Sequence, residues 1–249
     1  MEKLLKTLLL AVGLLFLLLF VSILFALPEG ENLLRELLSE EFLYAIFLTV
    51  GTSIVSTAVV MLLAVPTAYG LVRLDFPLKS LVKLLVDLPL FFPELLLGLL
   101  LLLLFSNLLK LQIAFTAGAV VLAQIAVAFP FAVKVLHTAF TEIDHRYELV
   151  ARSLGYRPFE VFFKVTLPMA KGGLLAALLV AFARSFGAFG AVLIFAGGVY
   201  MKTETLPVGI FLNISYGNIE RAALMGLLLM AVSLMTLLIF EWSTARKIK

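Results

Sequence analysis

The sequence predicts an all-α membrane protein with six transmembrane helices, on three observations. Of its 249 residues, 63% are hydrophobic and only 14% are charged, and the mean hydropathy is +1.16. Soluble domains carry about a quarter charged residues. Several apolar runs reach the ~20 residues that a helix needs to cross a bilayer. The chain is too short to add a large soluble domain to these spans.

The apolar segments divide the chain into six predicted spans. In chain order they cover residues 4–27, 42–72, 84–105, 114–136, 172–196 and 222–242. A signal peptide is the alternative for the first segment, but its apolar run exceeds the usual length of about 7–15 residues, and Phe25-Ala26-Leu27-Pro28 is a poor cleavage site. We therefore predict a retained helix. The acidic stretch at 28–41 is predicted to form a short helix on the outer surface.

The Lys and Arg residues predict the orientation. With the N-terminus in the cytoplasm and alternating spans, thirteen fall inside: Lys3, Lys6, Arg73, Lys79, Lys83, Arg146, Arg152, Arg157, Lys164, Lys171, Arg246, Lys247 and Lys249. Four fall outside: Arg35, Lys110, Lys202 and Arg221. This excess inside predicts a multi-pass protein with both termini cytoplasmic.

A charged segment, about residues 138–171, lies between the fourth and fifth spans and is cytoplasmic in this orientation. Its apolar residues recur at one helical spacing, at Ile143, Tyr147, Val150, Ala151 and Leu154. Asp144 can cap this helix and Gly155 suits a left-handed stop. Pro158 can open a second short helix, and Leu167-Pro168 bends the chain into the fifth span. The apolar stripe predicts either contact with the membrane surface or insertion into a groove of a partner protein.

The same segment carries a motif. Its residues ELVARSLG, with V-T-L-P beginning ten residues after Gly155, resemble the cytoplasmic EAA loop of ABC importer permeases, whose oxyanion branch has E-x-A-A-R-x-L-G. The matching residues are Glu148, Ala151, Arg152, Leu154, Gly155, Val165, Leu167 and Pro168. Val150 replaces the first alanine of the family pattern.

Other stretches extend this resemblance over most of the chain. VPTAYG at 65–70, followed by Arg73, resembles the end of the family's second helix, and 87–98 resembles its third. FARSFGAFGA at 182–191 is similar to F-A-R-x-x-G-E-F-G-A of molybdate and sulfate permeases. TETLP at 203–207 resembles molybdate/tungstate permeases.

The resemblance implies a type I ABC importer permease (MetI-like) architecture: one transmembrane permease domain over 1–249, in the plasma membrane, with a cytoplasmic coupling helix. The residues it implies for contact with an ATPase are Ile143, Tyr147, Glu148, Ala151, Arg152, Leu154, Gly155 and Pro168. Glu148 and Arg152 are also spaced to form an i,i+4 ion pair. The implied partners are two copies of an ABC ATP-binding subunit, an extracellular or periplasmic oxyanion-binding protein, a second copy of the chain, and membrane lipid. No nucleic acid is expected.

The resemblance implies import of molybdate or tungstate, with sulfate as the alternative cargo. The chain has no cysteine and no G-x-x-x-x-G-K-[ST] loop, and His137 and His145 are isolated. We therefore expect no metal, no cofactor and no enzyme activity, with ATP hydrolysis in a partner chain. An ATP-independent channel or secondary carrier is the alternative of another class, but carriers often show an inverted repeat, which we do not find. A membrane-embedded enzyme would need a catalytic constellation that the sequence lacks.

Charged residues inside spans are expensive, about 2.5–3.5 kcal/mol on insertion scales, and so suggest function. Arg184 and Glu94 fall at similar depths. Because Ala188 replaces the glutamate that the family has four residues after this arginine, we predict that Glu94 pairs with Arg184. The pair either fastens two helices permanently or opens during transport. The candidate path or gate residues are Arg184, Glu94, Ser53 and Gly187.

Two stripes of small residues favour helix packing over path lining. One is a set of hydroxyl residues on the second span, Thr49, Thr52, Ser53, Ser56 and Thr57. The other is Ala183, Gly187 and Ala191, spaced four apart on the fifth span. The prolines 66, 89, 93 and 130 are predicted to mark kinks or helix ends.

Overall fold

The computed structural model describes residues 1–28 and 31–245, and all regular secondary structure in these residues is helical. Four helices are long and apolar enough to cross a membrane alone. They are α1 (Glu2–Ser22, extended by η1, Ile23–Ala26), α3 (Glu40–Arg73), α6 (Ala117–Thr141) and α13 (Ile219–Ala245). Two bent helix pairs raise the number of spans to as many as six, if each pair counts as one.

The first bent pair corrects the predicted continuous span at 84–105. Helix α4 (Lys79–Asp87) and η2 (Leu88–Phe91) meet α5 (Glu94–Leu102) and η3 (Leu103–Leu108) at 116°. The break falls at Phe92 and Pro93, because proline has no N–H to continue the helical ladder. Pro93 therefore marks a break, as predicted, and Pro89 lies where α4 gives way to η2. Pro66 and Pro130 lie inside α3 and α6.

The second bent pair leads into the fifth span. Helices α8 (Pro158–Val161), η4 (Phe162–Thr166) and α9 (Leu167–Met169) meet α10 (Lys171–Phe186) at 77°. This confirms the predicted bend after Leu167-Pro168. The predicted continuous helix over 172–196 is wrong, because α10 ends at Phe186 and α11 (Gly190–Phe195) begins after a break. Ala183, Gly187 and Ala191 consequently do not share one helix face.

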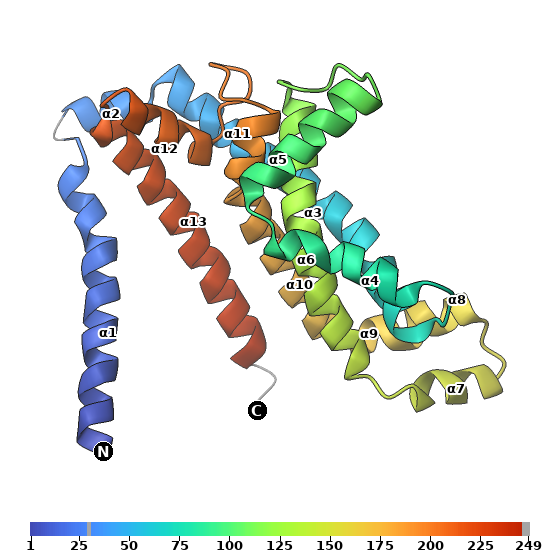
Figure 1. The fold of residues 1–249 in the computed structure, drawn as a ribbon. Helices are drawn as coiled ribbons and strands as arrows, with labels where there is room; N and C mark the ends of the chain where they lie inside the picture. Colours follow the sequence, from blue (N-terminus) through green and yellow to red (C-terminus); the bar gives the residue numbers. More distant parts are fainter. Residues whose placement is uncertain (29–30, 246–249) are drawn as a thin grey trace.

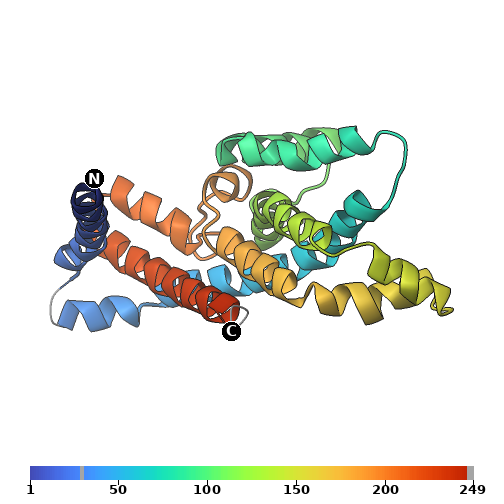
Figure 2. The ribbon, with the colours of Figure 1, turned by 90° about the horizontal axis from the view of Figure 1, so that it is seen from below.

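Helix α6 lies at the centre and packs against α3, α10 and α11 (Figure 1). Small side chains line these interfaces and let the helix backbones approach closely. The fully buried ones include Ala64, Ala68, Ala128, Ala132, Ala177 and Ala181. Helix α1 stands apart: none of its residues is buried. Seen from below, α1 lies at one edge of the molecule and the segment from α7 (Arg146–Ser153) to α9 at the opposite edge (Figure 2).

The hydroxyl residues of α3 confirm the packing interpretation. Gln124 of α6 is 1% exposed, and its Nε2 donates to Thr52 Oγ1 at 3.1 Å and to Ser53 Oγ at 3.4 Å. Its Oε1 accepts from Ser56 Oγ at 2.8 Å. Every polar atom of this buried amide is satisfied, so the stripe fastens α3 to α6.

The two ends of the bundle carry different elements. The start of α1, the end of α13 and helix α7 lie at one end, and α2 (Glu31–Leu37) and α12 (Leu206–Ser215) at the other (Figure 1). The short helix predicted after the first span is therefore present as α2. Arg246, Lys247 and Lys249 lie outside the described residues.

At the α2 end, Arg221 of α13 joins three segments. It lies 2.7 Å from Glu41 Oε2 and 3.2 Å from Glu36 Oε2, and it donates to Ser39 Oγ at 3.1 Å. Glu204, in the loop before α12, is buried close by.

Candidate functional site

The α7–α9 hairpin (residues 146–169) is built as the sequence predicts. Asp144 Oδ1 accepts the backbone N–H of Arg146, the first residue of α7, at 2.9 Å, although the N-cap position itself is His145. Gly155 has φ +91° and ends the helix in the left-handed region, which favours glycine. Pro158 is the first residue of α8. The hairpin is thus a defined structural unit.

The apolar stripe of α7 divides between two faces. Ile143 and Ala151 are buried against the rest of the chain, whereas Tyr147, Val150 and Leu154 are 55%, 58% and 73% exposed. Arg152, Gly155 and Pro168 are also exposed. The outward face of α7 therefore presents apolar side chains that no other part of the described chain covers.

Glu148 points inward and is 3% exposed. Its Oε1 accepts from Arg73 Nε at 2.9 Å and from Thr166 Oγ1 at 2.9 Å. Its Oε2 accepts from Tyr69 Oη at 3.2 Å and lies 3.6 Å from His145 Nδ1. A buried carboxylate needs such partners, since desolvation without them is costly.

This geometry corrects two expectations. Glu148 forms no i,i+4 pair with Arg152 among the described residues, because its carboxylate is turned toward α3 and η4. Its inward position also removes it from the surface that a partner could touch directly. Sequence reasoning missed the roles of Arg73, Tyr69 and Thr166. The available signal was a cation at the end of the second span, on the same predicted membrane side as Glu148.

A second polar site lies where α5, α6 and α10 meet. A pocket of about 160 Å³ there is lined by Glu94, Arg184, Phe131, Pro89, Leu90, Phe92, Leu97 and Val127. The guanidinium of Arg184 lies over the Phe131 ring, with Cζ 3.9 Å from the centroid. Such a contact favours a cation on the face of an aromatic ring. Glu94 and Arg184, both candidate path residues from the sequence, thus line the same pocket in the structure.

The predicted Glu94–Arg184 ion pair is wrong: within the described chain, neither side chain forms a salt bridge. Glu94 Oε2 instead accepts the backbone N–H groups of Phe189 and Gly190, at 3.1 and 3.0 Å. Arg184 lies in the last turn of α10. The helix break separates the two charges, because a carboxylate is favoured at the N-terminus of α11 and a cation at the C-terminus of α10.

The other two candidate path residues lie in different surroundings. Ser53 is fully buried between α3 and α6, which removes it from any open path in this conformation. Gly187 is exposed in the break after α10 and borders a groove of about 360 Å³ that Phe189, Phe211 and Leu229 also line.

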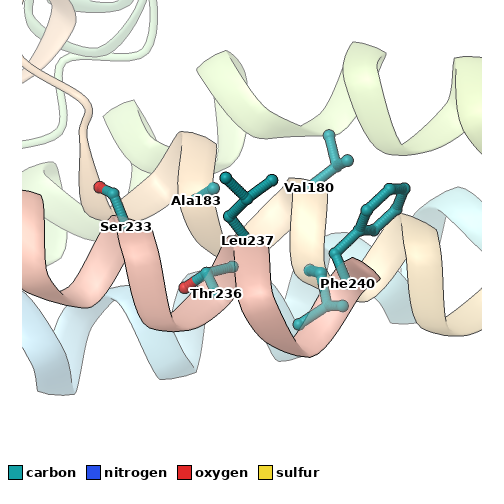
Figure 3. Close-up of a pocket in the computed structure, with 7 residues that line it drawn as sticks. Val180, Ala183, Ser233, Thr236, Leu237 and Phe240 are labelled. Carbon is teal, nitrogen blue, oxygen red and sulfur yellow. The ribbon is translucent and has the colours of Figure 1, made fainter. Parts of the chain in front are cut away.

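A further groove of about 290 Å³ separates α10 from α13 (Figure 3). Val180 and Ala183 line one wall, and Leu237 and Phe240 the other. Its polar groups are hydroxyls, and that of Thr236 donates to the Val232 carbonyl at 2.8 Å. Without a charged group, the groove suits apolar chains rather than an ion.

The known proteins that this chain resembles in sequence are membrane components of transport systems. The family model described as "Binding-protein-dependent transport system inner membrane component" matches residues 61–249. The "Molybdenum transport system permease protein ModB" of Mycobacterium tuberculosis is 38% identical over 203 residues, 78% of this chain and 76% of that protein. The "Molybdate/tungstate transport system permease protein WtpB" of Thermococcus kodakarensis is 31% identical over 219 residues, 88% of this chain and 85% of that protein.

A solved structure shares the fold. It is a chain of a bacterial alginate ABC transporter in complex with an alginate pentasaccharide-bound periplasmic protein, with a TM-score of 0.77 and 17% identity. The similarity covers 100% of this chain and 96% of that chain.

Proposed function

Because the chain belongs to the family of binding-protein-dependent transport system inner membrane components, we propose that it is the permease subunit of an ATP-driven importer of molybdate or tungstate. The names of its relatives support this cargo. Sulfate is the second candidate, since it is also a tetrahedral divalent oxyanion. The chain is a multi-pass membrane protein with up to six spans among its described residues.

One observation carries the proposal: the outward apolar face of α7. Tyr147, Val150 and Leu154 are more than half exposed on a short charged helix that is too short to cross a bilayer. A helix that offers such a stripe fits a hydrophobic groove on a partner protein. We propose that the partner is an ABC ATP-binding subunit, one copy per permease chain. Gly155 fixes where this face ends.

The cargo path is proposed to pass Arg184. Its side chain is exposed at the 160 Å³ pocket and has no carboxylate partner among the described residues, so its charge is open to an anion. Glu94 is engaged by the N-terminus of α11 and does not neutralise it. A single chain leaves Arg184 on its surface, so we propose that a second copy completes the path. A binding protein would deliver the oxyanion on the side opposite α7.

Orientation completes the proposal. The predicted excess of Lys and Arg assigns the α7 end to the cytoplasm, where ATP is available. Both termini would then be cytoplasmic.

The test is reconstitution of the chain with its ATP-binding subunit and binding protein in proteoliposomes. We expect uptake of radiolabelled molybdate or tungstate that needs ATP and all three components, and weaker or no uptake of sulfate. Uptake by the chain alone would support a channel or secondary carrier and overturn the proposal. Preferential uptake of sulfate would support the same type of ATP-driven importer, with sulfate as its cargo.

A further inference from the structure

Helix α7 is joined to the end of α3 by an ion pair and hydrogen bonds. Arg73 is the last residue of α3, and its side chain is 10% exposed. Its Nε donates to Glu148 Oε1 at 2.9 Å, and its Nη2 donates to the Ile143 carbonyl at 2.7 Å. One guanidinium therefore holds α7 and the chain just before it. Charge-assisted hydrogen bonds of this kind fix geometry as well as contributing energy.

Tyr69 strengthens the same contact from one turn earlier on α3. Its hydroxyl donates to Glu148 Oε2 at 3.2 Å, and its ring packs against Phe162 of η4, with centroids 4.7 Å apart. Thr166, also of η4, completes the carboxylate shell. The carboxylate of Glu148 thus ties α7 and η4 to α3, although Arg73 and Glu148 are 75 residues apart in the sequence.

The two faces of α7 have different contacts, and this difference decides how a force on α7 would reach the bundle. The outward side chains that a partner would bind, such as Tyr147 and Leu154, are exposed and do not themselves pack against the membrane helices. A force from the partner reaches the bundle through the inward face, which holds Ile143, Glu148 and Ala151. Apolar contacts are non-directional. The charged contact, in contrast, sets a fixed register between α7 and α3.

Helix α3 extends this contact across the molecule. It has 34 residues, or about 50 Å at 1.5 Å per residue. Near its other end, Thr49 Oγ1 accepts the backbone N–H of Leu206 in α12 at 2.8 Å. Between the two ends, its hydroxyl residues bind Gln124 of α6. A displacement of α3 would therefore also displace α6 and α12, or break these hydrogen bonds.

The alternative route from α7 runs along the chain into α10. It passes through η4, a π-helical turn, and through the 77° bend before α10. A π turn interrupts the regular α-helical hydrogen bonds, and proline removes a further donor. The covalent route from α7 to α10 therefore contains two interruptions of regular helical hydrogen bonding, whereas the contact from α7 to α3 is a direct ion pair.

We propose that Arg73 and Glu148 are positioning residues for coupling: their ion pair makes α3 move with α7 when the ATP-binding subunits close. The inference rests on the proposed function, because it assumes that α7 receives force from an ATPase. It assigns Glu148 an internal role in place of contact with that subunit.

The test compares transport with ATP consumption in the complete reconstituted complex. Glu148→Gln keeps the size of the side chain, and Arg73→Gln shortens it but keeps a hydrogen-bonding amide. Each variant removes the ion pair. We expect uptake per ATP hydrolysed to fall by about tenfold, within the usual range of coupling between sites, while ATP hydrolysis continues. Lys79→Gln is the matched control at the same end, since Lys79 pairs only with the exposed Asp75 in the described chain. Unchanged uptake per ATP in Arg73→Gln overturns the inference.

A second arm covers the case in which the single variants do not assemble. The chain has no cysteine, so Arg73→Cys with Glu148→Cys introduces the only thiols in this subunit. A short bis-methanethiosulfonate should restore uptake per ATP by linking α3 to α7, and a reducing agent should remove the gain. Equal coupling with and without the linker overturns the inference. If the wild-type complex shows no ATP-driven uptake, the proposed function fails instead.

Discussion

The carboxylate of Glu94 caps α11 from a different helix, with Oε2 3.0 Å from the backbone nitrogen of Gly190. The contact is close because Gly190 has no side chain: a Cβ there would lie 2.9 Å from Glu94 Cβ. The same oxygen accepts the N–H of Phe189. A break in a membrane-spanning segment is tolerated only where its backbone groups find partners in the protein, and Glu94 provides one.

Replacing Glu94 tests this capping role. Glu94→Ala removes the acceptor, and we expect a loss of about 0.5–2 kcal/mol in the free energy of unfolding, as for other N-caps. Glu94→Gln keeps a carbonyl oxygen and should lose less. Thermal unfolding of the purified protein in detergent measures both. Equal midpoints for wild type and Glu94→Ala would contradict the role.

Replacing Arg184 tests the proposed path. Arg184→Gln removes the charge and shortens the side chain but keeps a hydrogen-bonding amide. Uptake should fall by roughly tenfold to a hundredfold, corresponding to about 1.5–3 kcal/mol for a hydrogen bond to a charged group. Arg184→Lys should retain part of the uptake. Assembly with the ATP-binding subunit is checked by co-purification. Wild-type uptake by an assembled Arg184→Gln complex would show that Arg184 only packs on Phe131.

Gly155 sets the end of the proposed contact face. No atom lies within 4 Å of a Cβ built on it, but its φ of +91° disfavours any other residue, by about 1–2 kcal/mol. Gly155→Glu should uncouple ATP hydrolysis from uptake, because it places a charge beside the apolar face of α7.

Gly217 provides the matched control for Gly155. It has φ +82°, equally open space, and a position after α12 at the opposite end of the molecule. Gly217→Glu should cause similar strain without uncoupling. Full transport by Gly155→Glu, or equal loss in both variants, would contradict the contact.

Gly98 permits the close approach of α5 and α11. A Cβ at this position would lie 2.8 Å from the Ala191 carbonyl oxygen and 2.9 Å from Ala191 Cα. Gly98→Ala should therefore destabilise the protein by about 1–3 kcal/mol, the usual cost of overpacking. Gly51→Ala in α3 meets nothing within 4 Å and should leave the unfolding midpoint unchanged or slightly raised. Equal midpoints for the two variants would contradict this packing.

Glu204 predicts a pH dependence of stability. Burial, and secondly the charge of Glu41, raise the pKa of Glu204 above its ordinary value of 4.5, while Arg221 opposes the shift. Because the folded-state pKa is raised, ionisation costs stability: the stabilising contribution is complete below pH 4.5 and is lost as pH rises through the folded-state value. Glu204→Gln should raise the unfolding midpoint at neutral pH.

The pH profile of this variant is the critical measurement. The gain from Glu204→Gln should shrink as the pH falls toward 4.5. The exposed Glu220→Gln serves as the control and should follow the wild-type profile. If the gain in unfolding midpoint of Glu204→Gln did not change with pH, the raised pKa of Glu204 would be contradicted.

The long helices followed from the sequence because a bilayer imposes a single requirement on length and apolarity. The predicted segment 42–72 lies within α3, and 222–242 lies within α13. The turn between α7 and α8 was also predictable, since Gly155 and Pro158 act through their own backbone.

The breaks were harder to predict because they depend on distant residues. Helix α11 starts where it does through Glu94, which lies 96 residues from Gly190 in the sequence. The ion-pair partner of Glu148 likewise came from Arg73 on α3 rather than from Arg152 on its own helix. Local spacing favours i,i+4 pairs on a helix, but a carboxylate turned into the protein is paired by whichever cation the tertiary fold brings near.

None of the side chains of α1 is buried against the rest of the chain. Packing within the described chain therefore does not restrict which apolar residue stands at each position of α1. The fold of this subunit should tolerate most exchanges of one apolar residue for another along this helix. What constrains these residues is the thickness of the surrounding hydrocarbon, or the surface of an adjoining subunit. A chimera with an unrelated apolar helix of the same 21 residues in length should fold unaided, and any defect it showed would report on assembly.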